Sequence, residues 1–310
     1  MEIETAVFYA IMVLFTVANP ILLLVLRRKT KALATHTDNN LANETYHYQE
    51  TMFYLSIPFI FECGYRSVLP RVDIPRLCFW DVWGNNVLFG RLSAFIGEWC
   101  WMLQISLALQ TICEGLAQSL PAHKGLSVTS KFAFSLPFVC LLAEILGTAG
   151  PVTKNNWWCI WEAVTWTYMF AVASSAALYM FRLIDANEDL KVVNKDARTF
   201  CMCLFIIGLG YCPYMLALNI PMYVKRYYED EDDPNISYLS FAEGLPDISY
   251  CHSDDRSWSE WSADAAWMIP YFGPAVWTAI WMTKAPRIET SADAKPLKLS
   301  TGENDMEMND

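Results

Sequence analysis

Histidine is scarce in this sequence: His36, His47, His123 and His252 are the only four, and all lie in polar stretches. A haem inside a membrane bundle needs paired histidines on facing helices, and membrane di-iron desaturases need histidine boxes, so neither class fits. The chain also has no HExxH zinc motif and no Walker phosphate loop. No nucleophile elbow indicates a serine hydrolase. The sequence therefore predicts neither a metal site nor a bound cofactor.

Basic charge is also in short supply, with 22 Lys and Arg against 33 Asp and Glu. No basic patch with interleaved aromatic residues occurs, so no nucleic-acid partner is expected. The net charge of −11 does not indicate a soluble acidic protein, because much of it lies in the run 229–233 and in the C-terminal tail.

Long apolar blocks are what the chain does contain. Hydrophobic residues make up 54% of it, as is typical of a polytopic membrane protein. A helix needs about 20 mostly apolar residues to cross a bilayer. Seven blocks approach or meet that length: 5–26, 51–66, 86–110, 132–150, 157–183, 200–224 and 264–283. We therefore predict an all-α bundle of about seven transmembrane helices over residues 1–284.

Two parts of the chain need separate comment, the C-terminal tail and the second apolar block. The tail at 285–310 is polar, charged and without aromatic residues, which predicts a disordered cytoplasmic segment. The block at 51–66 is short and interrupted by Pro58. A re-entrant segment at this block is the alternative, and it leaves six spans and moves the C-terminus to the other side.

Charge flanking the blocks predicts an external N-terminus. The first block has only acidic residues before it and basic residues after it, which indicates a retained anchor and not a cleaved signal. Lys and Arg in short loops concentrate on the cytoplasmic side. Seven spans place 14 of the 22 basic residues inside: Arg27, Arg28, Lys29, Lys31, Lys124, Lys131, Arg182, Lys191, Lys195, Arg198, Lys284, Arg287, Lys295 and Lys298. The expected location is the plasma membrane or an internal membrane.

Two features of the predicted external loops fit that orientation. The sequon at Asn235 falls outside and is a possible glycosylation site, whereas the sequon at Asn43 falls inside. Cys78 and Cys251 both lie in external loops, while most other cysteines lie in the spans. A disulfide between Cys78 and Cys251 is possible if that side is oxidising.

Five charged residues from four spans share one depth zone. At about 1.5 Å per residue, Glu62 lies about 6 Å from the external interface, Arg91 about 8 Å, Glu144 and Glu162 about 9 Å, and Glu98 about 18 Å. Charges inside a bilayer are costly and usually face the bundle interior. Two interpretations stay open: an outward-opening polar cavity, or a structural network that ties helices together.

Polar residues near these charges extend the candidate site. Arg91 and Glu98 are two turns apart on one helix face, with Gln104 further inward. Arg66, Arg71 and Arg76 lie before this span on the predicted outer side. An Arg fork suits a carboxylate or phosphate, so these three are anion-binding candidates, and pairing with nearby Asp residues is the alternative.

Seven spans with this orientation invite comparison with receptors and retinal proteins. The third block has no Asp-Arg-Tyr-like triplet at its inner end, and the last block has neither an Asn-Pro-x-x-Tyr pattern nor a central lysine. We therefore identify no family from these residues.

Three functions of different classes are compatible with the sequence. The leading hypothesis is a carrier or binding protein that takes a small or amphipathic molecule into an outward-facing polar cavity. The second is an intramembrane enzyme that acts on a lipid or isoprenoid with a carboxylate as general acid. The third is a receptor or a structural membrane protein. The expected partners are the lipid bilayer and a small-molecule or lipid ligand.

Overall fold

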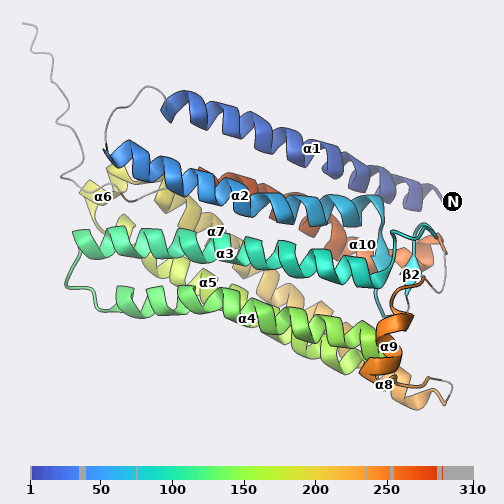
Figure 1. Cartoon of the computed structure of the whole chain (residues 1–310). Helices are drawn as coiled ribbons and strands as arrows, with labels where there is room; N and C mark the ends of the chain where they lie inside the picture. The colour runs from blue at the N-terminus through green and yellow to red at the C-terminus, as the bar shows by residue number, and fades with distance from the viewer. Residues whose placement is uncertain are drawn as a thin grey trace, which may run out of the picture.

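Helices account for nearly all regular structure in the computed structural model, which describes residues 2–34, 40–74, 76–234, 236–251, 255–284 and 288. The helices are α1 (Ile3–Ala34), α2 (Asn40–Val68), α3 (Val87–Ser119), α4 (Gly125–Thr153), α5 (Asn156–Asp185), α6 (Glu188–Val193), α7 (Lys195–Tyr214), α8 (Ile220–Asp232), α9 (Phe241–Asp247), α10 (Trp258–Pro270) and α11 (Val276–Met282). The long helices lie side by side as an all-α bundle (Figure 1).

Five helical stretches are long and apolar enough to cross a membrane: Ile3–Lys29, Val87–Ser119, Gly125–Thr153, Asn156–Asp185 and Lys195–Asp232. This composition indicates an integral membrane protein. Two further long helical rods of the bundle are less apolar than these five stretches. The first is α2, which runs through Pro58 as one continuous helix of 29 residues and does not turn back as a re-entrant segment would. The second is the C-terminal rod built from α10 and α11.

Short π-helical segments next to or containing proline interrupt two of the long helical rods. Segment η1 (Met215–Asn219) joins α7 to α8 just after Pro213, and η2 (Tyr271–Ala275) joins α10 to α11 and contains Pro274. Proline has no N–H to donate, so it breaks the regular helical hydrogen bonding and favours such local widening. We call the two composite rods the α7–α8 helix and the α10–α11 helix.

A side chain of α1 holds the interrupted α10–α11 helix in place. Asn19 donates its amide to the carbonyl of Phe272 at 2.9 Å, and the indole of Trp277 donates to the Asn19 carbonyl oxygen at 3.1 Å. Gly273 lies against the ring of Phe15, where any side chain would overlap that ring. The π-helical segment η2 is therefore fixed on its α1 side.

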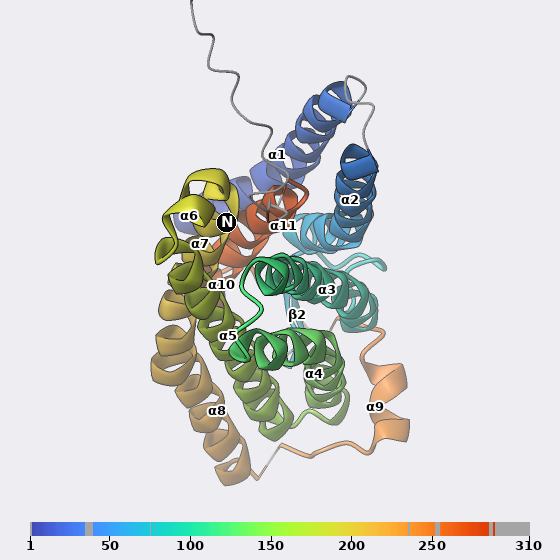
Figure 2. The same ribbon diagram turned by 90° about the vertical axis from the view of Figure 1, so that its left-hand side faces the viewer.

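Helices that follow one another in the sequence are mostly neighbours in space. The helices α1 to α5 pack in succession, α7 and α8 pack on α5, and α10 and α11 pack on α1, α2 and α3. Figure 2 shows this arrangement almost along the helix axes. Small residues allow the close approaches: at Gly97 and Gly208, an added Cβ would crowd Glu62 of α2 and Ser174 of α5, respectively.

A compact cap covers the end of the bundle that carries the N-terminus (Figure 1). Strands β1 (Arg71–Val72) and β2 (Leu77–Cys78) form a short antiparallel hairpin between α2 and α3. A disulfide joins Cys78 to Cys251, just before α10. Helix α9 packs on α4, and its Gly244 lies directly against the Val152 carbonyl. The cap therefore links the hairpin to the connection between α8 and α10.

Two nearby glycines of α7 should respond differently to the same added methyl group. We expect Gly208→Ala to destabilise the protein by about 1–3 kcal/mol, because the methyl would overlap the Ser174 hydroxyl. Gly210→Ala should instead stabilise it by about 0.5–1 kcal/mol, because no atom lies within 4 Å of an added Cβ and alanine favours helix. Thermal unfolding in detergent measures both, and equal shifts would contradict this packing.

Candidate functional site

A cavity of about 490 Å³ lies inside the bundle, among α3, α5, the α7–α8 helix and the α10–α11 helix. The β1 strand and the turn after it close its cap end, where Arg71 and Asp73 line the wall. Charged side chains gather at this end. Aromatic and aliphatic side chains line the rest, so the cavity is amphipathic along its length.

The first charged cluster joins α2, α3 and η2. Arg66 Nη1 lies 2.8 Å from Glu62 Oε1 and 3.5 Å from Glu98 Oε1. The Tyr271 hydroxyl lies 2.5 Å from Glu98 Oε1 and 3.3 Å from Glu62 Oε2. Arg66, Glu62 and Glu98 are buried. One guanidinium and one phenol thus hold two carboxyl groups of different helices together.

The second charged cluster centres on Arg91 of α3. Its Nε lies 2.6 Å from Asp73 Oδ2 of the turn after β1, and its Nη1 lies 3.0 Å from Glu162 Oε1 of α5. Burial acts to raise the pKa of Asp73, but the guanidinium groups of Arg91, Arg71 and Arg66 outweigh burial and hold that pKa below its usual value. Asp73 is therefore ionised at neutral pH and ties the cap to the bundle.

A third charged contact joins α8 to α10. Arg226 Nη2 lies 3.8 Å from Asp264 Oδ2, and the indole of Trp267 donates to Asp264 Oδ1 at 2.8 Å. All three residues line the cavity. The α7–α8 and α10–α11 helices thus meet through an ion pair at the charged end.

Arg71 differs from the other arginines of the cavity. Its side chain is 1% exposed, and its Nε lies 3.3 Å from Asp73 Oδ1. Its Cζ lies 5.4 Å from the centre of the Tyr65 ring, and none of its three guanidinium nitrogens makes a well-aligned hydrogen bond within the described part of the chain. Burial lowers the pKa of this guanidinium, with Asp73 acting in the opposite direction. Asp73 compensates this buried guanidinium only in part, and an anion bound at Arg71 would supply the hydrogen bonds that its nitrogens lack.

Gly90 makes the position of Arg71 possible. An added Cβ at Gly90 would overlap the Arg71 guanidinium, so the absence of a side chain on α3 is what leaves room for it. The sequence places the arginine and the glycine on different elements, β1 and α3, and the hairpin brings them together.

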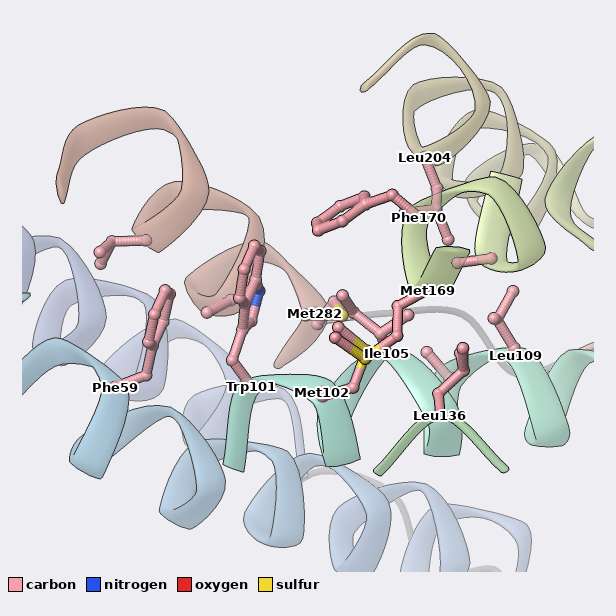
Figure 3. Packing of buried hydrophobic residues seen from close by; sticks show 14 of the residues in the cluster. Phe59, Trp101, Met102, Ile105, Leu109, Leu136, Met169, Phe170, Leu204 and Met282 are labelled. Atoms are coloured by element: carbon pink, nitrogen blue, oxygen red, sulfur yellow. The ribbon is translucent and has the colours of Figure 1, made fainter. Parts of the chain in front are cut away.

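The other end of the cavity is aromatic. Trp101 stacks on Phe59 with ring centroids 4.7 Å apart and lies 5.7 Å from Phe170. Figure 3 shows Trp101, Phe170 and Leu204 around the same space, with Ile105 and Met282 beside them. Phe200 of α7 and Trp281 of α11 meet at 5.6 Å between ring centroids. An apolar chain is the chemistry that suits this end.

Of the residues selected from the sequence, the structure brings some to the cavity and places others elsewhere. The ones that line it are Arg66, Arg71, Arg91, Glu98 and Glu162. Arg91 pairs with Glu162 and Asp73, and Glu98 pairs with Arg66. The two residues on one face of α3 therefore belong to different clusters.

Three other selected residues, Glu62, Gln104 and Glu144, do not line the cavity. Glu62 pairs with Arg66, which lines the cavity, but does not line it itself. Gln104 donates to the carbonyls of Met52 and Ala279 at 2.7 and 3.3 Å, which makes it a link between helices. Glu144 is fully buried, and its carboxyl oxygens make no hydrogen bond among the described residues.

The remaining selected residues belong to the cap. Arg76 pairs with Asp247 and donates to the Pro151 carbonyl at 2.9 Å, away from the cavity. Cys78 and Cys251 form the disulfide. Asn235 lies outside the described residues.

Sequence reasoning missed Trp101 and Phe170 and, on the last two rods, Tyr223, Arg226, Asp264, Trp267 and Tyr271. Arg226 falls just beyond the sixth predicted block, and Asp264 is the first residue of the seventh. Their opposite charges at matching ends of two consecutive blocks are a signal that could have paired them.

No protein family model, no curated protein and no solved structure matches this chain. Among the described residues, no group of three or more His, Cys, Asp or Glu side chains could hold a metal ion. The function must therefore be inferred from the cavity itself.

The two charged clusters make a double-mutant prediction. We expect Arg91→Gln to destabilise the protein by about 3–5 kcal/mol, because it leaves the buried Glu162 unpaired. Adding Glu162→Gln should recover part of this loss, with a coupling of about 0.5–3 kcal/mol. When Arg91→Gln is combined with Glu98→Gln instead, the destabilisation of the double variant should equal the sum of the two single destabilisations within about 0.5 kcal/mol. Thermal unfolding of the singles and doubles measures both couplings, and a larger coupling to Glu98 would contradict the observed pairing.

Proposed function

We propose that the chain crosses the membrane seven times, with α2 and the α10–α11 helix as the second and seventh spans. Helix α2 has 29 residues, a length of about 43 Å. The pieces α10, η2 and α11 have 13, 5 and 7 residues in direct succession, a length of about 37 Å. Both lengths exceed the roughly 30 Å of the hydrocarbon core. The lower apolarity of these two rods fits their position beside the charged clusters.

The proposed orientation puts the N-terminus and the cap outside. The positive-inside bias supports it, and so does the disulfide of the cap, because disulfides persist on oxidising sides of membranes. The basic residues at the cap end also have structural roles. Carboxylates pair with Arg66, Arg71, Arg76, Arg91, Lys154, Lys225 and Arg226, while Arg256 lies over the Trp80 ring.

Two introduced cysteines test this orientation. Leu245 is exposed on α9 at the cap end, and Ala122 is exposed in the connection between α3 and α4 at the opposite end. In intact cells, a membrane-impermeant maleimide should label Leu245→Cys and leave Ala122→Cys unlabelled until the cells are permeabilised. The wild-type chain is the background control. The reverse pattern would contradict the orientation.

For the function, we propose a membrane carrier or binding protein for an amphipathic molecule with an anionic headgroup. The observation that carries this proposal is Arg71, a buried guanidinium that pairs with Asp73 at 3.3 Å but makes no well-aligned hydrogen bond, at the charged end of a cavity whose other end is aromatic. A phosphate or carboxylate at Arg71 would satisfy its donors, and Arg66 and Arg91 nearby would add positive potential. The apolar part of the ligand would lie against Trp101, Phe170 and their neighbours.

Carriage also requires walls that can change shape. The cavity is bordered by two helices with π-helical interruptions and prolines, and interrupted helices at a mid-membrane site are a recurring feature of transporters. Helices α2, α3 and α5 supply one side of the site, and the interrupted helices form the other side.

A pair of amphiphiles with the same tail tests the headgroup preference. Dodecyl phosphate should raise the melting temperature of the purified protein, since a ligand at 100 times its Kd adds about 2.7 kcal/mol of stability. Dodecyltrimethylammonium, with the same chain and opposite charge, should not. Arg71→Gln should abolish the phosphate effect, and Arg71→Lys should retain only part of it, because lysine lacks the planar fork.

Lys225→Gln is the matched control, because it removes a cation at the same end from an exposed pair with Glu229 and does not touch the cavity. It should keep the full response to dodecyl phosphate. An equal response of wild type and Arg71→Gln would overturn the proposed headgroup site.

A further inference from the structure

The exposure of the cavity wall is concentrated on two helices. Most lining residues are buried or half-buried, including those of α3 and α5. Only four of the described lining residues are exposed, namely Gly210, Ala266, Pro270 and Pro274. One lies on α7, two on α10 and one on η2. The cavity therefore reaches the surface along the seam between the α7–α8 and α10–α11 helices.

The two helices of this seam pack in different directions. The α7–α8 helix packs on α5, where Gly208 lies against Ser174, whereas the α10–α11 helix packs on α1, α2 and α3. Contacts cross the seam near its ends. Arg226 and Asp264 form the contact at the cap end, and Phe200 and Trp281 form the other. The exposed lining residues lie between these contacts in the sequence of both helices.

Gly210 marks the opening on the α7 side. No atom lies within 4 Å of an added Cβ at this position, whereas nearly every other described glycine has a close neighbour. On the opposite wall, Pro270 and Pro274 are exposed and line the cavity. Neither wall presents a bulky side chain at these three positions.

The surface around the opening is apolar. Ile206, Leu209, Leu216 and Leu218 are each 56–62% exposed on the α7–α8 helix, and Trp277 is 45% exposed on α11. Large apolar side chains that are exposed on a membrane-spanning helix face lipid. At the cap end, by contrast, Arg71, Val72 and Asp264 are buried, and Asp73, Ile74, Arg91 and Arg226 are half-buried. The most exposed part of the cavity wall is thus the part that faces the bilayer.

From these observations we infer that the seam is a lateral portal through which a bilayer lipid with an anionic headgroup enters the cavity. This inference rests on the proposed function and specifies its ligand as a membrane lipid and not a solute taken from water. The headgroup passes to Arg71 at the cap end, and the acyl chain occupies the aromatic end between Trp101, Phe170 and Leu204. The lipid crosses the wall at Gly210, Pro270 and Pro274.

A photoreactive lipid tests the portal in the intact protein. The protein is reconstituted in nanodiscs containing phosphatidic acid with a diazirine at the end of one acyl chain, and the labelled residues are identified by mass spectrometry after irradiation. In the wild type, we expect label on residues of the aromatic end, such as Phe200, Leu204 and Met282. Gly210→Trp should lower this internal labelling at least tenfold, because the indole fills the opening.

The neighbouring substitution Leu209→Trp is the matched control. Leu209 is 60% exposed and does not line the cavity. The substitution places the same indole side chain on the same turn of the helix as Gly210→Trp does. It should leave internal labelling unchanged. Ala275→Trp places an indole on the opposite wall and should lower internal labelling as Gly210→Trp does. It replaces Gly210→Trp in the experiment if that variant does not fold.

Each outcome separates the portal from the headgroup site. Equal internal labelling of wild type, Gly210→Trp and Ala275→Trp overturns the portal, as does a wild type without internal label. A comparable loss in Leu209→Trp also overturns it, because the loss then does not depend on the opening. If Gly210→Trp blocks labelling and Arg71→Gln does not reduce it, the portal stands and the proposed headgroup site fails.

Discussion

The structure depends on the need to neutralise charge where water is scarce. Arg66 and Arg91 each join two carboxylates from different elements, and these contacts tie α2, α3, α5 and the cap together. Removing one partner of a buried ion pair is far more costly than removing both. The helices that supply these charges must therefore keep their relative positions, and the cavity is the space that this arrangement encloses.

The same requirement explains why Arg71 stands apart. Its neighbours Arg66 and Arg91 already have their carboxylates, and Asp73 binds Arg91 more closely than it binds Arg71, at 2.6 Å against 3.3 Å. The fold thus leaves one buried cation incompletely compensated. A site that binds an anion needs such a residue, because a fully satisfied arginine would have to break its own contacts to receive a ligand.

The sequence predicted the helical bundle well because apolar blocks report directly on burial in lipid. Block lengths were less reliable: α2 begins before residue 51, since its polar first turns are helical without being apolar. The grouping of Glu62, Arg91, Glu98 and Glu162 near one depth could also be predicted from helix rise alone. Their pairing could not, because it depends on helix rotation. Arg71 is the clearest case, since its position depends on a two-strand hairpin and on the space left by Gly90.

The disulfide of the cap has a mechanical consequence for the α10–α11 helix. Cys251 lies a short distance before Trp258, so the bond to Cys78 anchors that end of the helix to the hairpin that carries Arg71. The same helix is held again at Phe272 by Asn19 and at Ala279 by Gln104. A helix tied near its start, its middle and its end shifts little along its whole length. The displacement that would widen the seam and separate Phe200 from Trp281 therefore falls on the opposite wall, the α7–α8 helix.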